Sequence, residues 1–541
     1  MDIIRFYIFF ILMLFLSVSH AQVNQYMVFF ADKSGTPYSV SNPSAYLSSK
    51  AIQRRAIQNI PVVESDLPVN PAYITNIENT GASVIYKTKW MNGVLVSCDA
   101  SLLSAINALP EVSSIEYVSP GAHPSAGGRK KSVKEKKDTK EAATDNQLSL
   151  LGIDEMHADG HRGEGVTIAF FDGGFSGANL TAPFTHIFSE NRFDAVASYD
   201  FVHGGHEVFQ YDDHGTRVWS VIAAYSPGSF IGGAYKANFQ LYVTEDVPTE
   251  YRVEEYNWLF AAERADSAGV DIINSSLGYN IDFDDASMDY STGQMDGETA
   301  IITRAAQFAA DKGMLVVTSA GNEGLDASWR IITAPADGRD VLAVGSVNSF
   351  MVRSPTSSVG PTADGRIKPD VVALGSGTSV VRANGSITTG SGTSFSAPLV
   401  TGLAAGLWQR QPGLSNKKLI EAIRMSASLA PNPDNFLGYG LPNYTAAKHY
   451  IEQVEQEELF AVFPNPITHD TLTIRPKNPE DLTPVVILLV SAQGQIIRDQ
   501  NVNFTWLNNQ YTADLSFLSA GIYLIRIQAG EQVFVYKIVK I

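Results

Sequence analysis

The chain is organised around Gly392-Thr-Ser-Phe-Ser-Ala-Pro398, a glycine-containing turn that leads into the apolar, small-residue stretch 399–408. This pattern predicts a buried helix that begins near Ser394. The unpaired amides and the positive end of the dipole at a helix start stabilise negative charge, which suits a nucleophilic serine. A serine N-cap on a buried helix is the simpler interpretation. Only partners elsewhere in the chain decide between the two.

Two other segments supply such partners. The apolar, strand-like run 166–171 ends in Asp172-Gly-Gly, and His214-Gly-Thr follows two aspartates at a predicted helix start. A serine hydroxyl needs an imidazole to accept its proton, and the imidazole needs a carboxylate that fixes its tautomer. Taken singly, each motif is explained equally well as a turn, a surface loop or a metal ligand. Together, Asp172, His214 and Ser394 predict a catalytic triad.

Length, charge and cysteine content limit the number of domains, the kinds of partner and the possible disulfides. The chain has 541 residues and a net charge of -17. Its length predicts about two to four domains, and its acidity argues against a nucleic-acid partner. The single cysteine, Cys98, permits no internal disulfide. The apolar run 3–18, followed by small residues, predicts a signal peptide over 1–21 and export from the cytoplasm.

Residues 146–450 alternate short apolar runs with helical patterns. This alternation predicts an α/β domain with a parallel sheet and helices on both faces, whose active site lies at the carboxyl ends of the strands. The predicted strands are 166–171, 239–243, 270–273, 314–318 and 341–344, and the predicted helices are 250–268, 298–312, 399–408 and 416–428.

The flanking regions differ from the centre. Residues 22–119 interleave short strands with two helices, which predicts a small α+β domain. Residues 120–145 are basic and poor in apolar side chains, as expected of an exposed linker. Residues 459–541 contain β-like segments separated by turn residues, which predicts an antiparallel sandwich.

The central region resembles the subtilisin-like serine peptidases, or subtilases. The order Asp172, His214, Ser394 is also that of subtilisin. The resemblance implies a secreted serine endopeptidase that forms an acyl-enzyme on Ser394. The matching stretches are Asp172-Gly-Gly, His214-Gly-Thr, Asn274-Ser-Ser-Leu-Gly278, Ser319-Ala-Gly-Asn-Glu-Gly324, Gly360-Pro-Thr-Ala-Asp-Gly-Arg-Ile-Lys-Pro-Asp370 and Gly392-Thr-Ser-Phe-Ser-Ala-Pro398.

The resemblance also implies roles outside the triad. Asn322 would form the oxyanion hole together with the backbone N–H of Ser394. Protein or peptide substrates would pair their backbone with one segment and place a side chain against another. Catalysis would require no cofactor, and structural calcium ions are compatible with the family although the sequence does not locate their ligands. The substrate-binding residues implied are Ser276, Leu277 and Gly278 for the backbone, and Ala320 and Gly321 for the pocket wall.

Some features leave alternatives open. Tyr279 stands where the family often has glycine, and an acidic insertion follows at 282–298. The insertion is consistent with a preference for basic substrates, with calcium binding or with a solvated loop. The rival to the peptidase function is a catalytically inactive subtilase fold that serves as a surface adhesin or binding protein.

The N-terminal domain, 22–119, resembles the inhibitory propeptide of subtilases. In that family a small α+β domain packs on the enzyme and lays its C-terminal tail in the active site. Here residues 115–118 would be the tail. Self-cleavage is then expected between about residues 118 and 146, in the predicted linker.

Residues 459–541 resemble the C-terminal sorting domain of the type IX secretion system of Bacteroidetes. This implies export by Sec and then by the type IX machinery to the cell surface or the medium, with no transmembrane helix in the mature chain. A carbohydrate-binding or stabilising β-module is the alternative. The matching stretches are Phe463-Pro-Asn-Pro466, Val490-Ser-Ala-Gln-Gly494, Asp514-Leu-Ser-Phe-Leu-Ser-Ala-Gly-Ile-Tyr523 and Lys537-Ile-Val-Lys540.

Overall fold

The computed structural model describes residues 23–121, 144–468, 470–477, 485–492, 494–497, 503–530 and 532–541. The predicted signal peptide and most of the predicted linker lie outside these residues. The chain divides into two compact units, Met1–Thr445 and Ala446–Ile541. Each unit is described separately below.

The centre of the first unit is a seven-stranded parallel sheet with the strand order β13-β12-β11-β10-β5-β9-β6. Every residue of β5, β10, β11 and β12 is buried, so both faces of the sheet are covered, as is usual for parallel sheets. The strands are β5 (Thr167–Asp172), β6 (Tyr199–Asp200), β9 (Asn238–Val243), β10 (Ile272–Ser275), β11 (Leu315–Ser319), β12 (Val341–Val347) and β13 (Val371–Leu374).

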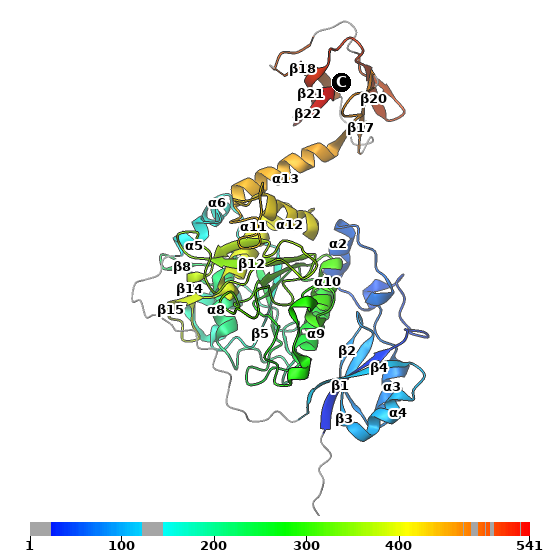
Figure 1. Cartoon of the computed structure of the whole chain (residues 1–541), viewed down its shortest axis with the longest axis vertical. Coiled ribbons are helices and arrows are strands. Elements are labelled where there is room, and N and C mark those ends of the chain that lie inside the picture. Colours follow the sequence, from blue (N-terminus) through cyan, green and yellow to red (C-terminus); the bar gives the residue numbers. More distant parts are fainter. Residues whose placement is uncertain are drawn as a thin grey trace, which may run out of the picture. The chain divides into compact units, whose positions relative to one another are not determined.

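Two groups of helices cover the sheet (Figure 1). Helices α9 and α10 pack together on one face, where Phe171, Ile273 and Val316 join their apolar core. Helices α8 and α11 pack together, and α11 contacts β10 to β13. The helices of this unit are α5 (Asp145–Ser149), α6 (Ile153–Ala158), α7 (Thr185–Ser189), α8 (His214–Ala223), α9 (Val253–Ala268), α10 (Ile301–Asp311), α11 (Thr393–Arg410) and α12 (Asn416–Met425). Two short hairpins, β7 (Tyr225–Ser226) with β8 (Phe230–Ile231) and β14 (Ser376–Val381) with β15 (Ile387–Ser391), complete this part. Helix α13 (Tyr444–Leu459) belongs to the second unit except for its first two residues.

The N-terminal domain is a four-stranded antiparallel sheet with the order β2-β3-β1-β4. Alternation along its strands separates two apolar faces. Tyr26 and Val28 face the domain's own helices, whereas Met27 and Leu95 join the apolar core around α9 and α10. The elements are β1 (Val23–Phe30), α2 (Ser49–Ile57), α3 (Pro71–Asn79), β2 (Ser83–Thr88), β3 (Gly93–Asp99), α4 (Leu103–Asn107) and β4 (Val112–Pro120).

The structure corrects the prediction for residues 115–118. They lie inside β4, where Ile115 pairs with Val28 of β1, and are therefore a strand of the N-terminal sheet and not a tail in the active site. An extended apolar segment can pair with a sheet edge or lie in a substrate cleft. Here it pairs with the edge of β1. The residues that follow, 122–143, lie outside the described part.

The second unit contains two small antiparallel sheets around one apolar core. The first sheet has the order β16-β17-β20-β19 and the second β18-β21-β22. The predicted all-β sandwich is thus confirmed. The strands are β16 (Phe460–Phe463), β17 (Thr471–Pro476), β18 (Val485–Ser491), β19 (Thr505–Leu507), β20 (Gln510–Asp514), β21 (Gly521–Ala529) and β22 (Gln532–Lys540).

The fold class agrees with the sequence-based prediction, but several elements were missed, most of them short. The sequence analysis identified neither β6 and β13 in the parallel sheet nor helix α3 in the N-terminal domain. The two strands are two and four residues long. Such short runs carry too few positions for a periodic pattern.

Candidate active site

Three strands bring the predicted site together at one edge of the parallel sheet. In the register of the sheet, Ser275 of β10 lies beside Phe171 of β5 on one side and beside Thr318 of β11 on the other. The residues that follow these positions therefore emerge at the same edge, which we call the carboxyl edge. They include Asp172 and Ser276.

Asp172 and His214 form a direct pair. Nδ1 of His214 lies 2.9 Å from both carboxylate oxygens of Asp172. Asp172 is buried, and His214 is the first residue of α8. A Cβ on Gly215 would lie 2.3 Å from the carbonyl oxygen of Gly174, so only glycine allows α8 to begin this close to the end of β5.

This pairing controls the protonation of His214. Burial of the ring lowers its pKa, but the negative charge of Asp172 and the hydrogen bond to Asp172 raise it by more. The net result is a pKa above the usual value of 6.5. Arg217 opposes this rise, and Asp212 supports it. The carboxylate thus favours the imidazolium form and holds Nδ1 as the protonated nitrogen.

Ser394 lies in the first turn of α11, after the N-cap Gly392. Its hydroxyl donates to the carbonyl oxygen of Ser276 at 3.4 Å, and in return the hydroxyl of Ser276 donates to the carbonyl oxygen of Ser394 at 2.9 Å. In an α-helix the carbonyl oxygen of Ser394 would normally accept a hydrogen bond from the amide of residue 398. Pro398 has no N–H, so the Ser394 carbonyl is free to bind Ser276.

The structure brings His214 and the start of α11 together. The ring of His214 lies 6.0 Å, centroid to centroid, from the ring of Phe395, the residue after Ser394. Among the described residues, no hydrogen bond joins the Ser394 hydroxyl to His214, because the hydroxyl is turned toward Ser276. Rotation about the Cα–Cβ bond of Ser394 changes which group its hydroxyl faces.

Asn322 meets the same helix start. Its side-chain oxygen accepts from the backbone N–H of Thr393 at 3.0 Å and from the Thr393 hydroxyl at 3.1 Å. Within the described part of the chain no acceptor binds its Nδ2. The point that a Cβ on Gly392 would occupy lies 3.6 Å from Oδ1 and 3.8 Å from Nδ2 of Asn322, and 3.9 Å from the amide nitrogen of Ser394. The side-chain amide of Asn322 and the backbone amide of Ser394 therefore lie near one point beside Gly392.

The two predicted substrate-binding segments are neighbours. The hydroxyl of Ser319 donates to the carbonyl oxygen of Leu277 at 3.3 Å, linking the ends of β10 and β11. Ser276 is buried, whereas Leu277 and Gly278 are half-buried. On the second segment, Ala320 and Gly321 are buried.

Thr333, which no motif identified, lies between these segments. Its hydroxyl oxygen would be 2.5 Å from a Cβ on Gly278 and 2.7 Å from a Cβ on Gly321. It is buried and has no hydrogen-bond partner among the described residues. Its neighbours in the sequence, Ile332 and Ala334, are plain core residues, so only the three-dimensional structure reveals its position.

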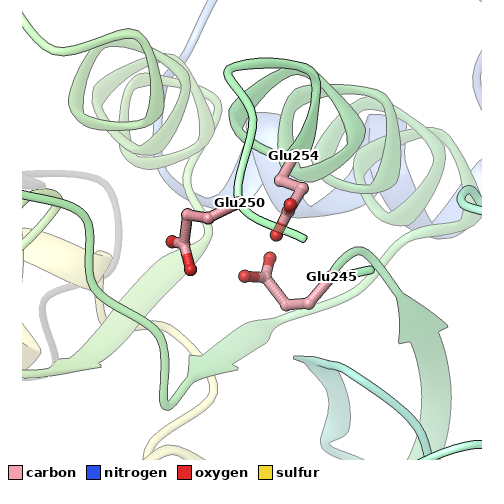
Figure 2. A group of neighbouring side chains, drawn as sticks. All are labelled: Glu245, Glu250 and Glu254. Carbon is pink, nitrogen blue, oxygen red and sulfur yellow. The ribbon is translucent and has the colours of Figure 1, made fainter. Parts of the chain in front are cut away.

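A carboxylate cluster lies at the same edge (Figure 2). Oxygens of Glu245, which follows β9, of Glu250 and of Glu254 on α9 lie within 4.8 Å of one another. Burial, followed by the negative charges of its neighbours, raises the pKa of Glu254 well above its usual value, and the pKa of Glu245 is raised to about 7. The hydroxyl of Tyr279 donates to Glu245 at 2.6 Å. The raised pKa values favour a protonated carboxyl in the cluster, and three carboxylate oxygens this close together are also a ligand set for a divalent cation.

Three carboxylates of the acidic insertion accept hydrogen bonds from backbone amides, two of them inside the insertion and one outside it, at Glu250. Asp284 accepts from the amide of Glu250 at 2.9 Å, Asp285 from that of Ser287 at 3.0 Å and Asp289 from that of Phe283 at 3.0 Å. These contacts favour the solvated-loop interpretation, in which aspartates shape turns.

Comparison with known proteins agrees with this geometry. Residues 163–440 match the model of the subtilase family. The match covers more than half of the chain, and the chain belongs to this family. Residues 25–138 match the peptidase S8 propeptide domain of Bacteroidota, and residues 461–541 match the secretion system C-terminal sorting domain.

The relatives include bacterial subtilisins. The chain is 28% identical to subtilisin DY of Bacillus licheniformis over 301 residues, 56% of this chain and 97% of the relative. It is equally identical to subtilisin NAT of Bacillus subtilis subsp. natto over 302 residues, 56% of this chain and 70% of the relative. The chain is therefore a serine protease of the subtilase family.

Among solved structures, the fold is similar to that of the epidermin leader peptide processing serine protease of Staphylococcus aureus. The TM-score is 0.55 at 17% identity, with 79% of this chain and 98% of that chain covered. At this identity the likeness shows the fold alone.

The sorting domain indicates where the protein acts. A C-terminal domain of the type IX secretion system directs the protein to the cell surface or the medium. Within the described residues, no helix combines the length and the apolar character needed to cross a bilayer.

Proposed function

We propose that the protein is a secreted serine endopeptidase that uses Asp172, His214 and Ser394 as its catalytic triad. The observation that carries the proposal is the two-oxygen contact of Asp172 with Nδ1 of His214, since it leaves the other ring nitrogen free to act as a base. The base lies beside the helix start that holds Ser394. This neighbourhood supports a nucleophilic role for Ser394 once its hydroxyl turns from Ser276 toward His214.

In the first step, Ser394 turns from Ser276 and transfers its proton to His214 as its oxygen attacks the substrate carbonyl. Asp172 stabilises the imidazolium that forms. The negative charge on the substrate oxygen would lie between Nδ2 of Asn322 and the amide of Ser394. The nearness of both nitrogens to the point where a Cβ on Gly392 would stand supports this placement.

In the second step, His214 returns the proton to the leaving amine, and an acyl-enzyme remains on Ser394. His214 then removes a proton from the water that attacks the ester carbonyl. It returns this proton to the Ser394 oxygen as the bond from that oxygen to the acyl carbon breaks and the acid product leaves. Base, nucleophile and donors are all groups of the protein, so we propose that the reaction itself requires no cofactor. Structural calcium remains a prediction without assigned ligands.

The substrate would extend along the carboxyl edge. We propose that Ser276, Leu277 and Gly278 pair with its backbone as an added strand. Ala320 and Gly321 would flank the side chain that precedes the cleaved bond. For export, we propose that residues 1–21 direct the chain through Sec before the type IX step.

A fluorophosphonate probe tests this function directly, because it reacts with an activated serine and not with an ordinary one. We expect the secreted protein to be labelled once and the Ser394→Ala variant to remain unlabelled. Digestion of a long unstructured peptide with blocked ends would distinguish endopeptidase from exopeptidase action. An unlabelled wild-type protein without activity would instead favour the adhesin function.

A further inference from the structure

The two segments proposed to bind the substrate, 276–278 and 320–321, are joined by a third segment that no motif predicted. Backbone hydrogen bonds from residues 333–334 reach both of them. The amide of residue 333 donates to the carbonyl oxygen of Ala320 at 3.2 Å, and residue 334 exchanges two hydrogen bonds with Tyr279, at 2.9 and 3.0 Å. Residues 333–334 therefore bridge the two walls of the pocket for the substrate side chain.

The side chain of Thr333 occupies the space between these walls. A Cβ on Gly278 would lie 2.5 Å from the Thr333 hydroxyl oxygen and 3.3 Å from its Cβ. A Cβ on Gly321 would lie 2.7 Å from the same oxygen and 2.9 Å from the Thr333 methyl carbon. Close-packed atoms do not approach one another this closely without a clash, so Thr333 fits only because both walls are glycine at these points. A substrate side chain that enters between the two glycines would meet Thr333.

The hydroxyl of Thr333 lacks a partner. Thr333 is 2% exposed, and no described residue forms a hydrogen bond with its hydroxyl. A buried hydroxyl without a partner is destabilising, and native proteins keep few of them. The neighbouring hydroxyl of Ser358, which would lie 2.8 Å from a Cβ on Gly321, already accepts from the amide of Glu323 at 3.0 Å. Thr333 thus offers the pocket an unused donor and acceptor.

Both walls adjoin the proposed catalytic residues. Gly321 directly precedes Asn322, and its carbonyl oxygen accepts from the hydroxyl of Thr393 at 3.2 Å. On the other wall, Ser276 exchanges hydrogen bonds with Ser394. The space between the walls therefore lies beside the helix start that holds the proposed nucleophile, where the residue before the cleaved bond would be bound.

We propose that Thr333 closes this pocket and that its hydroxyl selects serine, a small side chain with a hydroxyl group, directly before the cleaved bond. This inference rests on the proposed function, because it names the substrate class of that active site. The substrate serine supplies the partner that Thr333 lacks, since one hydroxyl donates to the other. Alanine fits but leaves Thr333 unpaired, whereas leucine and phenylalanine collide with it.

The test measures kcat/KM of the secreted protein on four peptide nitroanilides. They differ only in their last residue, which is alanine, serine, leucine or phenylalanine and directly precedes the bond that breaks. We expect the wild type to cleave the serine peptide about 3- to 10-fold more efficiently than the alanine peptide, the usual effect of one hydrogen bond. The leucine and phenylalanine peptides should be cleaved at least about tenfold less efficiently than the alanine peptide.

Two variants separate the hydroxyl of Thr333 from its size. Thr333→Val keeps the shape of the side chain and removes the hydroxyl, so the preference for serine over alanine should disappear while leucine and phenylalanine stay disfavoured. It breaks no side-chain hydrogen bond of the described structure, and we expect it to fold. Thr333→Ala makes room in the pocket and should raise kcat/KM for the leucine peptide about tenfold or more, with little change for the alanine peptide.

Thr318→Val is the matched control. Thr318 of β11 is also a buried threonine whose hydroxyl has no partner in the described part of the chain, but it is not among the nearest neighbours of Gly278 or Gly321. This variant should leave the order of the four peptides unchanged.

The same order of peptides in the wild type, Thr333→Val and Thr333→Ala would overturn the inference, as would a wild type that prefers leucine or phenylalanine. A protein that reacts with the fluorophosphonate probe but cleaves none of the four peptides would also overturn it. A protein that neither reacts with the probe nor cleaves any peptide would refute the proposed function, and the inference with it. The two failures are therefore distinguishable.

Discussion

The polar side chains of Asp266 and of the proposed active site, at the two edges of the parallel sheet, differ in burial and in how completely they are hydrogen-bonded. At the edge where the strands begin, Asp266 is fully buried and bound by three cations. At the carboxyl edge, His214 is part-exposed, Asn322 is exposed and the Ser394 hydroxyl makes only a long 3.4 Å hydrogen bond. Fully compensated charges hold parts of the chain together, whereas incompletely satisfied groups remain available to a substrate.

The largest expected effect tests whether Ser394 is the reactive group at the carboxyl edge. Ser394→Ala should lower kcat by about 10⁴-fold or more, up to about 10⁶-fold as for the nucleophile of a subtilisin. Hydrolysis of a chromogenic peptide measures it. Ser396→Ala is the control, because the Ser396 hydroxyl binds the carbonyl oxygen of Thr393 in its own helix, and it should cost less than about tenfold. Equal losses in both variants would contradict the assignment.

The second prediction concerns the pH dependence that Asp172 imposes on His214. Only neutral imidazole accepts a proton, so kcat/KM should fall as pH falls through the raised pKa of His214, which lies above 6.5. Asp172→Asn removes the main cause of the rise and should shift this fall to lower pH, with kcat reduced about 10⁴-fold.

Asp212→Asn provides the control for that profile. Its carboxylate accepts from the backbone N–H of His214 at 3.0 Å and does not bind the ring. For Asp212→Asn we expect only a small shift of the acid limb of the pH–rate profile and a nearly normal kcat. A pH–rate profile that is the same for the wild type and Asp172→Asn would mean that the acid limb does not report His214.

The third prediction concerns the pair of donors near Gly392. Asn322→Ala should reduce kcat by about 10²- to 10³-fold, as for such a donor in a subtilisin, with little change in KM, because the donor acts on charge that exists only in the transition state. Steady-state kinetics on one peptide separates the two constants. A rise in KM at unchanged kcat would instead place Asn322 in ordinary substrate binding.

The smallest expected effect concerns stability at the carboxyl edge. The pKa of Glu254 is raised in the folded protein, so its protonated form stabilises the fold at low pH, and this contribution is lost as pH rises above about 4.5. Glu254→Gln removes the charge and should raise Tm by about 2 to 4 °C at pH 8, with a smaller gain at pH 5. Calorimetry at pH 5 and pH 8 measures the change in Tm. An equal rise in Tm at both pH values would show that the Glu254 charge is not the cause.

Much of the site was predictable from local sequence. An apolar strand that ends in Asp172, a histidine at a helix start and a serine in a glycine-containing turn are each local patterns, and the carboxyl-edge rule brings them together. The roles of Asn322 and of residues 276–278 came only from resemblance to the family. Thr333 was missed because its significance depends on two glycines from other segments.

The sequence by itself determined the longer strands and helices of the central domain and that the triad residues emerge at one edge, because apolar periodicity and strand direction are local properties of the chain. Tertiary structure alone decided that residues 115–118 pair with β1 and that Arg54 and Arg55 bind Asp266. Asp266 lies more than 200 positions further along the chain. An extended strand or a buried cation is compatible with many partners. Which partner it takes depends on which surfaces packing brings within hydrogen-bond range.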